Sequence, residues 1–147
     1  MVKRRTQNLK RKTRKQRGGF QVKFGERILN KPLSVKNFPK NTPRVNFKGP
    51  GLYTLIMWDP DAPAKSWLHW LIVNAEEGDV KRGEELMRYA PPTPPSGTHT
   101  YHLAIYSQKG PIQVEAPAER GYFNHTEFIQ EYELIEIEKT SVQVSAA

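Results

Sequence analysis

The sequence has no cysteine among its 147 residues. This absence excludes disulfides, thiolate metal sites and a cysteine nucleophile, and it fits a reducing compartment. No apolar run approaches the ~20 residues that a membrane-spanning helix needs. The charged N-terminus also lacks the apolar core of a secretory signal peptide. These absences predict an intracellular protein, cytoplasmic or nuclear or both, with no transmembrane segment.

Acidic residues are missing from the first twenty positions, which hold nine of the 23 Lys and Arg. The other 127 residues hold 14 basic and 15 acidic residues, so the net charge of +8 comes from this segment. Like charges and a lack of apolar residues predict a disordered basic arm over residues 1–19. The arm could bind nucleic acid or another polyanion, act as a nuclear localisation signal, or merely be solvated. Its candidate polyanion-binding residues are Lys3, Arg4, Arg5, Lys10, Arg11, Lys12, Arg14, Lys15 and Arg17.

Helical periodicity is scarce in the remainder, and short strands separated by Gly, Pro and Asn predominate. Length and composition predict one domain over residues 20–147, with about the last eight residues flexible. Apolar stretches at 52–58 and 67–74 predict buried central strands, and 98–108 predicts the longest strand. Shorter strands are predicted at 20–24, 44–47, 112–116 and beyond 135, with loops at 76–86 and 90–97. One helix is predicted from Asn124, with Phe128, Tyr132 and Ile135 on one face. The pattern is typical of a mostly antiparallel β-sandwich or barrel.

Polar side chains gather at the predicted strand ends. Alternation places Trp67, His69 and Leu71 on one face of their strand. It likewise places His99, Tyr101 and Leu103 on one face of the later strand, with His102 opposite. Asp59 follows the strand 52–58 directly, so its carboxylate can lie at the end of the sheet. These side chains could therefore line the opening of one pocket, with a rigid rim formed by the prolines of 60–63 and 91–95.

Four kinds of site are compatible with these residues. A histidine–aspartate pair could serve a hydrolase, but Ser66 and Ser96 lie outside any G-x-S-x-G elbow. Asp59, His69 and His99 could bind a metal, although no H-x-x-x-H spacing supports it. An anion pocket would use histidines, a tyrosine hydroxyl and an apolar wall, with Asp59 favouring a protonated histidine. The residues could also be purely structural, but their convergence on one opening favours the anion pocket. We assign no catalytic residue, metal or cofactor.

Three segments together resemble a known family. They are GPGLYTLIMWDPDAP, then WLHWLIVN, then PPSGTHTYHLAIYSQ. Their D-P-D-x-P, H-W and G-x-H motifs are similar, in identity and order, to those of the phosphatidylethanolamine-binding proteins. That family includes Raf kinase inhibitor proteins and plant flowering regulators. The resemblance covers roughly residues 20–135.

The resemblance implies an antiparallel β-sandwich with a large central sheet, one short C-terminal helix and a small anion-binding pocket. Matched motif by motif, the ligand-binding residues would be Asp59, Trp67, His69, His99 and Tyr101. The rim would comprise Pro60, Asp61, Pro63, Pro94 and Gly97. Because the family has cis peptide bonds near this motif, a cis bond is expected at Ala62–Pro63.

Three departures from the family pattern bear on the pocket. Thr100 stands where the family usually has arginine, so the ionic interaction with Asp61 that the resemblance implies is missing. The linker Ala64-Lys65-Ser66 is shorter than usual, which would open the rim. The chain stops soon after EYELIEIEK, without room for the last helix of many eukaryotic members.

The sequence therefore predicts a non-catalytic module that binds a phosphate- or carboxylate-bearing ligand, such as a phospholipid head group or a phosphorylated residue. It would regulate a partner protein, with kinase or protease inhibition as the activities the family suggests. The alternative is a structural protein associated with nucleic acid or another polyanion through its basic arm. A residual hydrolase is the least favoured interpretation.

Overall fold

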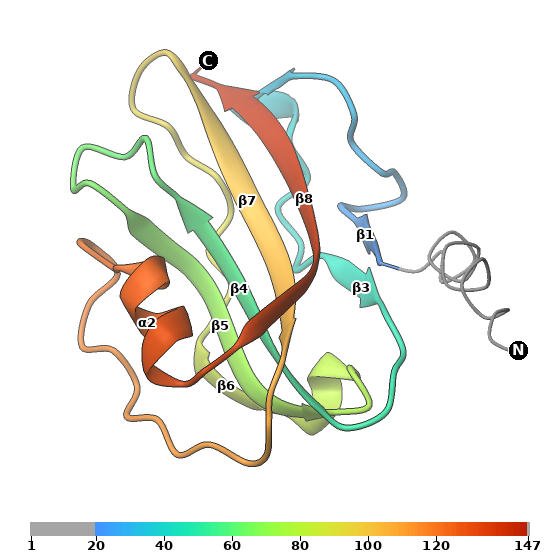
Figure 1. Ribbon diagram of the computed structural model, residues 1–147. Coiled ribbons are helices and arrows are strands. Elements are labelled where there is room, and N and C mark those ends of the chain that lie inside the picture. The colour runs from blue at the N-terminus through green and yellow to red at the C-terminus, as the bar shows by residue number, and fades with distance from the viewer. Residues whose placement is uncertain (1–19, 147) are drawn as a thin grey trace, which may run out of the picture.

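The computed structural model describes residues 20–146, and the basic arm predicted over 1–19 lies outside them. Six strands form a mixed sheet in the order β2-β8-β7-β4-β5-β6, and β1 and β3 form a separate two-stranded sheet (Figure 1). The strands are β1 (Gln21–Lys23), β2 (Leu33–Ser34), β3 (Arg44–Asn46), β4 (Leu52–Asp59), β5 (Trp67–Glu76), β6 (Glu84–Met87), β7 (Thr98–Ser107) and β8 (Ile135–Ser145). The helical segments are the 3-10 turns η1 (Val35–Asn37) and η2 (Val80–Arg82) and the α-helix α2 (His125–Glu131). The predicted mostly-β fold with one large sheet is confirmed.

Strands β4, β5 and β7 form the centre of the large sheet, as their apolar sequences predict. All neighbouring pairs among β8, β7, β4, β5 and β6 are antiparallel, whereas β2 pairs with β8 in parallel. Seven of the eight residues of β4 are buried. Because both faces of these strands are covered, they read as continuous apolar runs instead of alternating ones.

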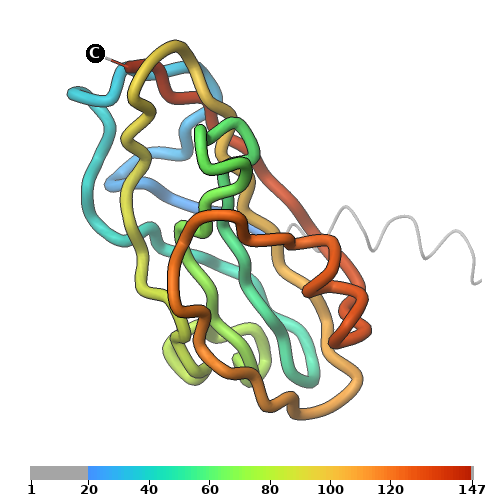
Figure 2. Tube along the Cα trace, turned by 90° about the vertical axis from the view of Figure 1, so that its left-hand side faces the viewer, coloured from blue at the N-terminus to red at the C-terminus, as the bar shows by residue number. Residues whose placement is uncertain are grey.

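Two hydrophobic clusters lie on opposite faces of the large sheet. The first combines residues of the sheet such as Leu55 and Tyr101 with Val22 and Phe24 near the two-stranded sheet. The second packs Trp58 and other sheet residues against Phe128 of α2. Figures 1 and 2 show the same layering, with the N-terminal segments in blue and cyan on one side and α2 in orange on the other. We refer to these as the small-sheet face and the helix face.

Helix α2 begins as the sequence predicts, but it ends sooner. The Asn124 side chain accepts a hydrogen bond from the Glu127 backbone N–H at 3.0 Å, which caps the first turn. Phe128 is buried, but the helix ends at Glu131 and Ile135 starts β8 with 58% of its surface exposed. The predicted helical face ending in Ile135 is therefore wrong at that residue.

Three other local predictions are wrong for identifiable reasons. Residues 76–86 are not merely a loop, because η2 and the start of β6 lie within them. No strand forms at 112–116, since the Asn74 amide bonds both the N–H and the carbonyl of Ile112 and takes the place of a strand partner. The prediction of a flexible C-terminal end is wrong for residues up to Ser145, because β8 pairs with β7 and buries Val142 and Val144.

Among residues 20–146, no helix has both the length and the apolar character of a membrane-spanning segment.

Candidate functional site

A β-bulge in β5 determines where the His69 side chain points. Met57 of β4 lies opposite Trp70 and Trp58 lies opposite Leu68, so His69 is the extra residue on β5. The bulge lets His69 and Trp70 share the small-sheet face, where His69 contacts Tyr101 with ring centroids 5.1 Å apart. Leu71 then belongs to the cluster on the helix face. The predicted shared face of His69 and Leu71 is therefore wrong, because strict alternation ignores the bulge.

Asp59 ends β4 and is the polar centre of the site. It is only 2% exposed. Its Oδ2 accepts from His99 Nδ1 at 2.6 Å, and its Oδ1 accepts the Asp61 backbone N–H at 2.8 Å. Burial and the nearby charge of Asp59 raise the pKa of the Tyr101 hydroxyl. A buried carboxylate with these partners is held rigidly, which fixes the His99 ring on β7.

One ring nitrogen of His69, Nε2, is left free for a ligand because the other, Nδ1, is hydrogen-bonded within the protein. Its Nδ1 lies 2.7 Å from the carbonyl oxygen of Ala90, so Nδ1 carries the hydrogen and Nε2 stays available. Burial lowers the pKa of His69, although the Ala90 carbonyl and the charge of Asp59 oppose this effect. In the neutral ring Nε2 is an acceptor, and protonation converts it into a donor. Binding of an anion at Nε2 would therefore be coupled to binding of a proton.

The side chains singled out from the sequence meet at one cavity of about 200 Å³. Strands β4, β5 and β7 supply Asp59, Trp67, His69, His99 and Tyr101, and all five line it. Of the predicted rim, only Pro63 lines the cavity, and Ala62, Thr93 and Pro95 complete the lining. Pro60, Asp61, Pro94 and Gly97 do not line it. In the proline-rich segment Pro94 is buried, and its exposed neighbours Thr93 and Pro95 line the cavity instead.

The turn between β4 and β5 makes its reversal without the expected cis bond. The described residues contain no cis peptide, so the prediction at Ala62–Pro63 is wrong. Lys65 instead adopts a positive φ of 68°, and its N–H bonds the Ala62 carbonyl at 2.9 Å. A left-handed residue therefore allows the short linker to turn back into β5.

The missing arginine is partly replaced by the backbone. The Thr100 N–H donates to Asp61 Oδ2 at 3.0 Å, so the D-P-D turn is still joined to β7. The bond involves one neutral donor instead of a guanidinium, and it lies at an exposed position. The turn thus keeps its position, while the site loses the positive charge that the family pattern would supply.

Arg120 fixes the backbone beside the site, but no sequence pattern predicted this role. Its guanidinium donates to the carbonyls of Leu68 and His69 at 3.0 and 3.3 Å, and to that of Arg88 at 2.8 Å. The Arg120 carbonyl in turn accepts from the Leu68 N–H at 2.8 Å. The arginine stands in an irregular segment with no periodicity, so only the fold shows that it fixes the start of β5.

The arrangement offers little support for hydrolysis or metal binding. Ser66 and Ser96 do not line the cavity, so neither is placed as a nucleophile beside His69 or His99. Within residues 20–146 no group of three or more His, Asp or Glu side chains comes together as metal ligands do. A small cavity with two imidazoles, a phenol and a buried carboxylate is suited to holding a small polar group.

A second histidine cluster lies on the helix face, away from the cavity. Trp58 stacks on His125 with ring centroids 4.3 Å apart, and its centroid lies 5.3 Å from that of His102. His102 also contacts Ser141 Oγ through Nδ1 at 2.8 Å. The cluster joins β4 and β7 to the first residue of α2. Lys139 and Glu136 of β8 and Asp59 and Asp61 of β4 and its turn act on these rings electrostatically.

Acidification is expected to destabilise the fold through this cluster. Burial lowers the pKa of His102 and His125, and Lys139 lowers both further. Since the unfolded chain protonates near the ordinary value of 6.5, their stabilising contribution is complete above that pH and is lost as the pH falls through the lowered values. Urea unfolding of wild type and a His102→Asn/His125→Asn variant, followed between about pH 7.5 and about pH 5, tests this. The variant should lose less stability than wild type. An equal loss in both proteins would assign the pH dependence elsewhere, for example to His69.

A sequence profile of phosphatidylethanolamine-binding proteins matches residues 5–142. The chain belongs to the phosphatidylethanolamine-binding protein family. The match extends beyond residues 20–135 on both sides, so the similarity to the family covers more of the chain than the three motifs predicted.

Plant proteins are among the family members similar to this chain. Protein MOTHER of FT and TFL1 homolog 2 of Oryza sativa is 36% identical over 124 residues, covering 76% of this chain and 71% of that protein. Protein FLOWERING LOCUS T of Arabidopsis thaliana is 35% identical over 127 residues, covering 78% and 72%. The fold is similar to a carboxypeptidase Y inhibitor in a crystal structure with its cognate proteinase. That comparison has a TM-score of 0.73 and 18% identity, and it covers 87% of this chain and 83% of the inhibitor.

Proposed function

We propose that the protein is a non-catalytic anion-binding module that regulates a partner protein. The observation that carries this proposal is the convergence of Asp59, Trp67, His69, His99 and Tyr101 on one cavity of about 200 Å³. That volume suits a phosphate or carboxylate group better than a whole drug-sized ligand, which needs a larger cavity.

The charge states of the cavity determine which ligand it favours. The Asp59 carboxylate is already bonded to His99 and to the Asp61 N–H, so it is not an open cation site. His69 Nε2 becomes a donor once that ring is protonated, and a bound anion favours this protonation. Trp67, which is 36% exposed, and Pro63 supply an apolar edge beside these groups.

Regulation of a protein partner is the role that family membership favours. A protein with this fold is known as an inhibitor bound to its cognate proteinase. The family also supplied the expectation of kinase inhibition. In our proposal the chain inhibits a protease or a kinase, and the cavity binds a phosphate- or carboxylate-bearing ligand from a phospholipid head group or a phosphorylated residue.

Calorimetric titration of phosphate, phosphoethanolamine and phosphotyrosine into the full chain tests the cavity. Wild type should bind at least one of them saturably. His69→Ala should weaken that binding by at least about tenfold, because a charge-assisted hydrogen bond is lost.

His102→Ala is the matched control for this titration. His102 lies on the helix face, so its removal should leave anion affinity unchanged even if it alters stability. Equal loss in both variants, or no saturable binding by wild type, would reject the cavity as an anion site.

The basic arm is a second candidate for binding, on the strength of its nine Lys and Arg. In this alternative the arm associates with nucleic acid or another polyanion, and the cationic clusters favour a nuclear or cytoplasmic location. Polyanion affinity that disappears when residues 1–18 are deleted, with anion binding by the cavity unchanged, would show two independent activities.

A further inference from the structure

A larger cavity of about 660 Å³ lies between the two sheets, away from the candidate anion site. One wall is made by five consecutive residues, 42–46, which include all of β3. The opposite wall comes from β5, η2 and β6, where Trp70, Ile72 and Val80 are apolar. Neither the anion-binding proposal nor the family comparison assigns a role to this cavity.

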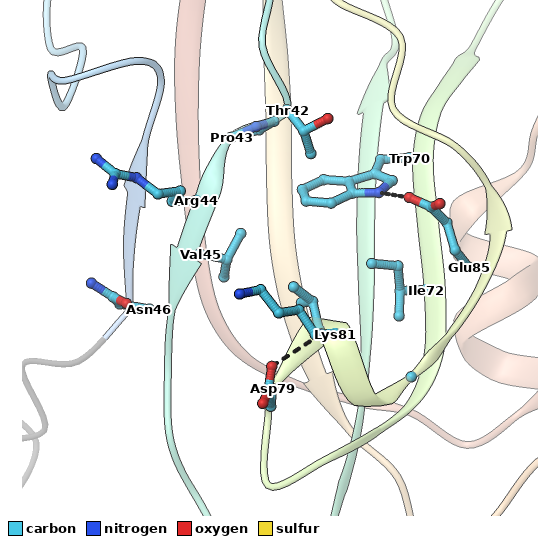
Figure 3. A pocket seen from close by; sticks show the side chains of 12 residues that line it. Thr42, Pro43, Arg44, Val45, Asn46, Trp70, Ile72, Asp79, Lys81 and Glu85 are labelled. Atoms are coloured by element: carbon cyan, nitrogen blue, oxygen red, sulfur yellow. Dashed lines mark hydrogen bonds between the residues drawn. The ribbon is translucent and has the colours of Figure 1, made fainter.

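The cavity borders an edge of β3 that has no strand partner. Among the described residues β3 pairs with β1 alone, through Lys23, Val22 and Gln21. Figure 3 shows β1 on one side of β3 and the cavity on the other. Arg44 and Asn46 line the cavity although their side chains point away from it in Figure 3, so they line it with backbone. Unpaired strand edges present N–H and C=O groups that accept an added strand.

Side chains around the edge provide a specific surface for such a strand. Val45 points into the cavity toward Trp70 and Ile72 (Figure 3). The Trp70 Nε1–H donates to Glu85 Oε2 at 2.7 Å, which holds the indole against the cavity. An extended segment beside β3 would place one apolar side chain next to Val45 and direct its neighbours to the opposite face.

The charge on the face of β3 opposite the cavity favours acidic neighbours. Within the cavity the Asp79 and Glu85 carboxylates offset the charge of Lys81. Arg44 points away from the cavity, where it contacts the Gly25 carbonyl at 3.4 Å and Glu26 at 3.7 Å, the latter pair with side chains 61% and 92% exposed. Because such exposed contacts are weak, Arg44 can exchange them for a carboxylate on an adjacent strand.

We propose that the free edge of β3 binds an extended peptide segment of a partner protein in which an apolar residue is flanked by acidic ones. The segment adds a third strand to the β1–β3 sheet and fills the cavity with its apolar side chain. Main-chain hydrogen bonds supply affinity, while Val45 and Arg44 supply specificity.

The test uses the full chain and three fluorescein-labelled peptides. The first is Glu-Leu-Glu-Val-Glu, the second is the same peptide with alternate backbone nitrogens methylated, and the third replaces each Glu by Lys. The basic arm attracts any acidic peptide, but the first two carry equal charge. Fluorescence anisotropy should show binding of the first, about tenfold weaker binding of the second because strand hydrogen bonds are lost, and weaker binding of the third.

Protein variants locate the site. Arg44→Glu should weaken binding of the acidic peptide by about fivefold or more, whereas Arg27→Glu, with the same charge change elsewhere, should not. Bound peptide should also slow amide hydrogen exchange in residues 42–46. The proposal is overturned if methylation has no effect, if the two variants behave alike, if the lysine peptide binds more tightly, or if no peptide binds.

Discussion

Replacing Asp59 by alanine is expected to lower the free energy of unfolding by about 3 kcal/mol, because it leaves buried hydrogen-bond donors without their acceptor. The change leaves His99, 7% exposed, without its carboxylate partner, and it removes the acceptor of the Asp61 N–H. Anion binding should disappear as well, since the His99 ring loses its orientation. Urea unfolding at neutral pH measures the first effect, and calorimetric titration of phosphate measures the second.

Asp61→Ala is the matched control, two residues further along the same turn. The Asp61 side chain is exposed and accepts one hydrogen bond, from the Thr100 N–H. Its removal should cost about 1 kcal/mol. If the two alanine variants lost equal stability, the description of Asp59 as a buried polar centre would be wrong.

Trp70→Ala should be similarly destabilising, by about 3–5 kcal/mol, because it opens a large cavity in the core. The side chain is 2% exposed and packs edge-on against Tyr89, with ring centroids 5.6 Å apart. Its indole N–H also bonds Glu85. Denaturant titration should show a lower midpoint with an unchanged slope, which identifies a loss of stability instead of a change in compactness.

Trp67→Ala provides the comparison for that variant, since it removes the same side chain from the same strand. Trp67 is 36% exposed, so less contact is lost and the destabilisation should be clearly smaller. Trp70→Phe should restore most of the stability of Trp70→Ala, because the ring is kept and only one hydrogen bond, worth about 1 kcal/mol, is lost. A phenylalanine variant as unstable as the alanine variant would contradict a packing role.

The pattern of apolar residues and the chemistry of the motifs were sufficient to predict the central strands and to predict which side chains line one cavity. Residues 52–58 and 98–108 could be identified as strands because burial on one or both faces leaves a direct trace in residue type. The helix start at Asn124 was predictable because capping depends on residues only three positions apart. The convergence of Asp59, His69 and His99 followed from strand ends and alternation, and the family motifs pointed to the same residues.

The remaining features depend on contacts between distant residues, which a local pattern does not encode. The bulge at His69 reverses the alternation only because β4 fixes the register of β5. The Asn74 amide prevents a strand at Ile112, 38 positions away. Arg120 reaches carbonyls of Leu68 and His69, more than fifty residues earlier. Such bonds appear only after the fold has brought the partners together.

The pairing of β7 with β8 has a consequence for biosynthesis. His99 and Tyr101 lie on β7 opposite Val144 and Val142, so β8, translated after the other described strands, supports the ring positions in the cavity. A nascent chain that has released β4, β5 and β7 still exposes the outer edge of β7 until β8 leaves the ribosome. Sheets assembled from such distant pairings form slowly and are prone to association meanwhile. Until β8 emerges, the unpaired edge of β7 is therefore expected to be open to association with other chains.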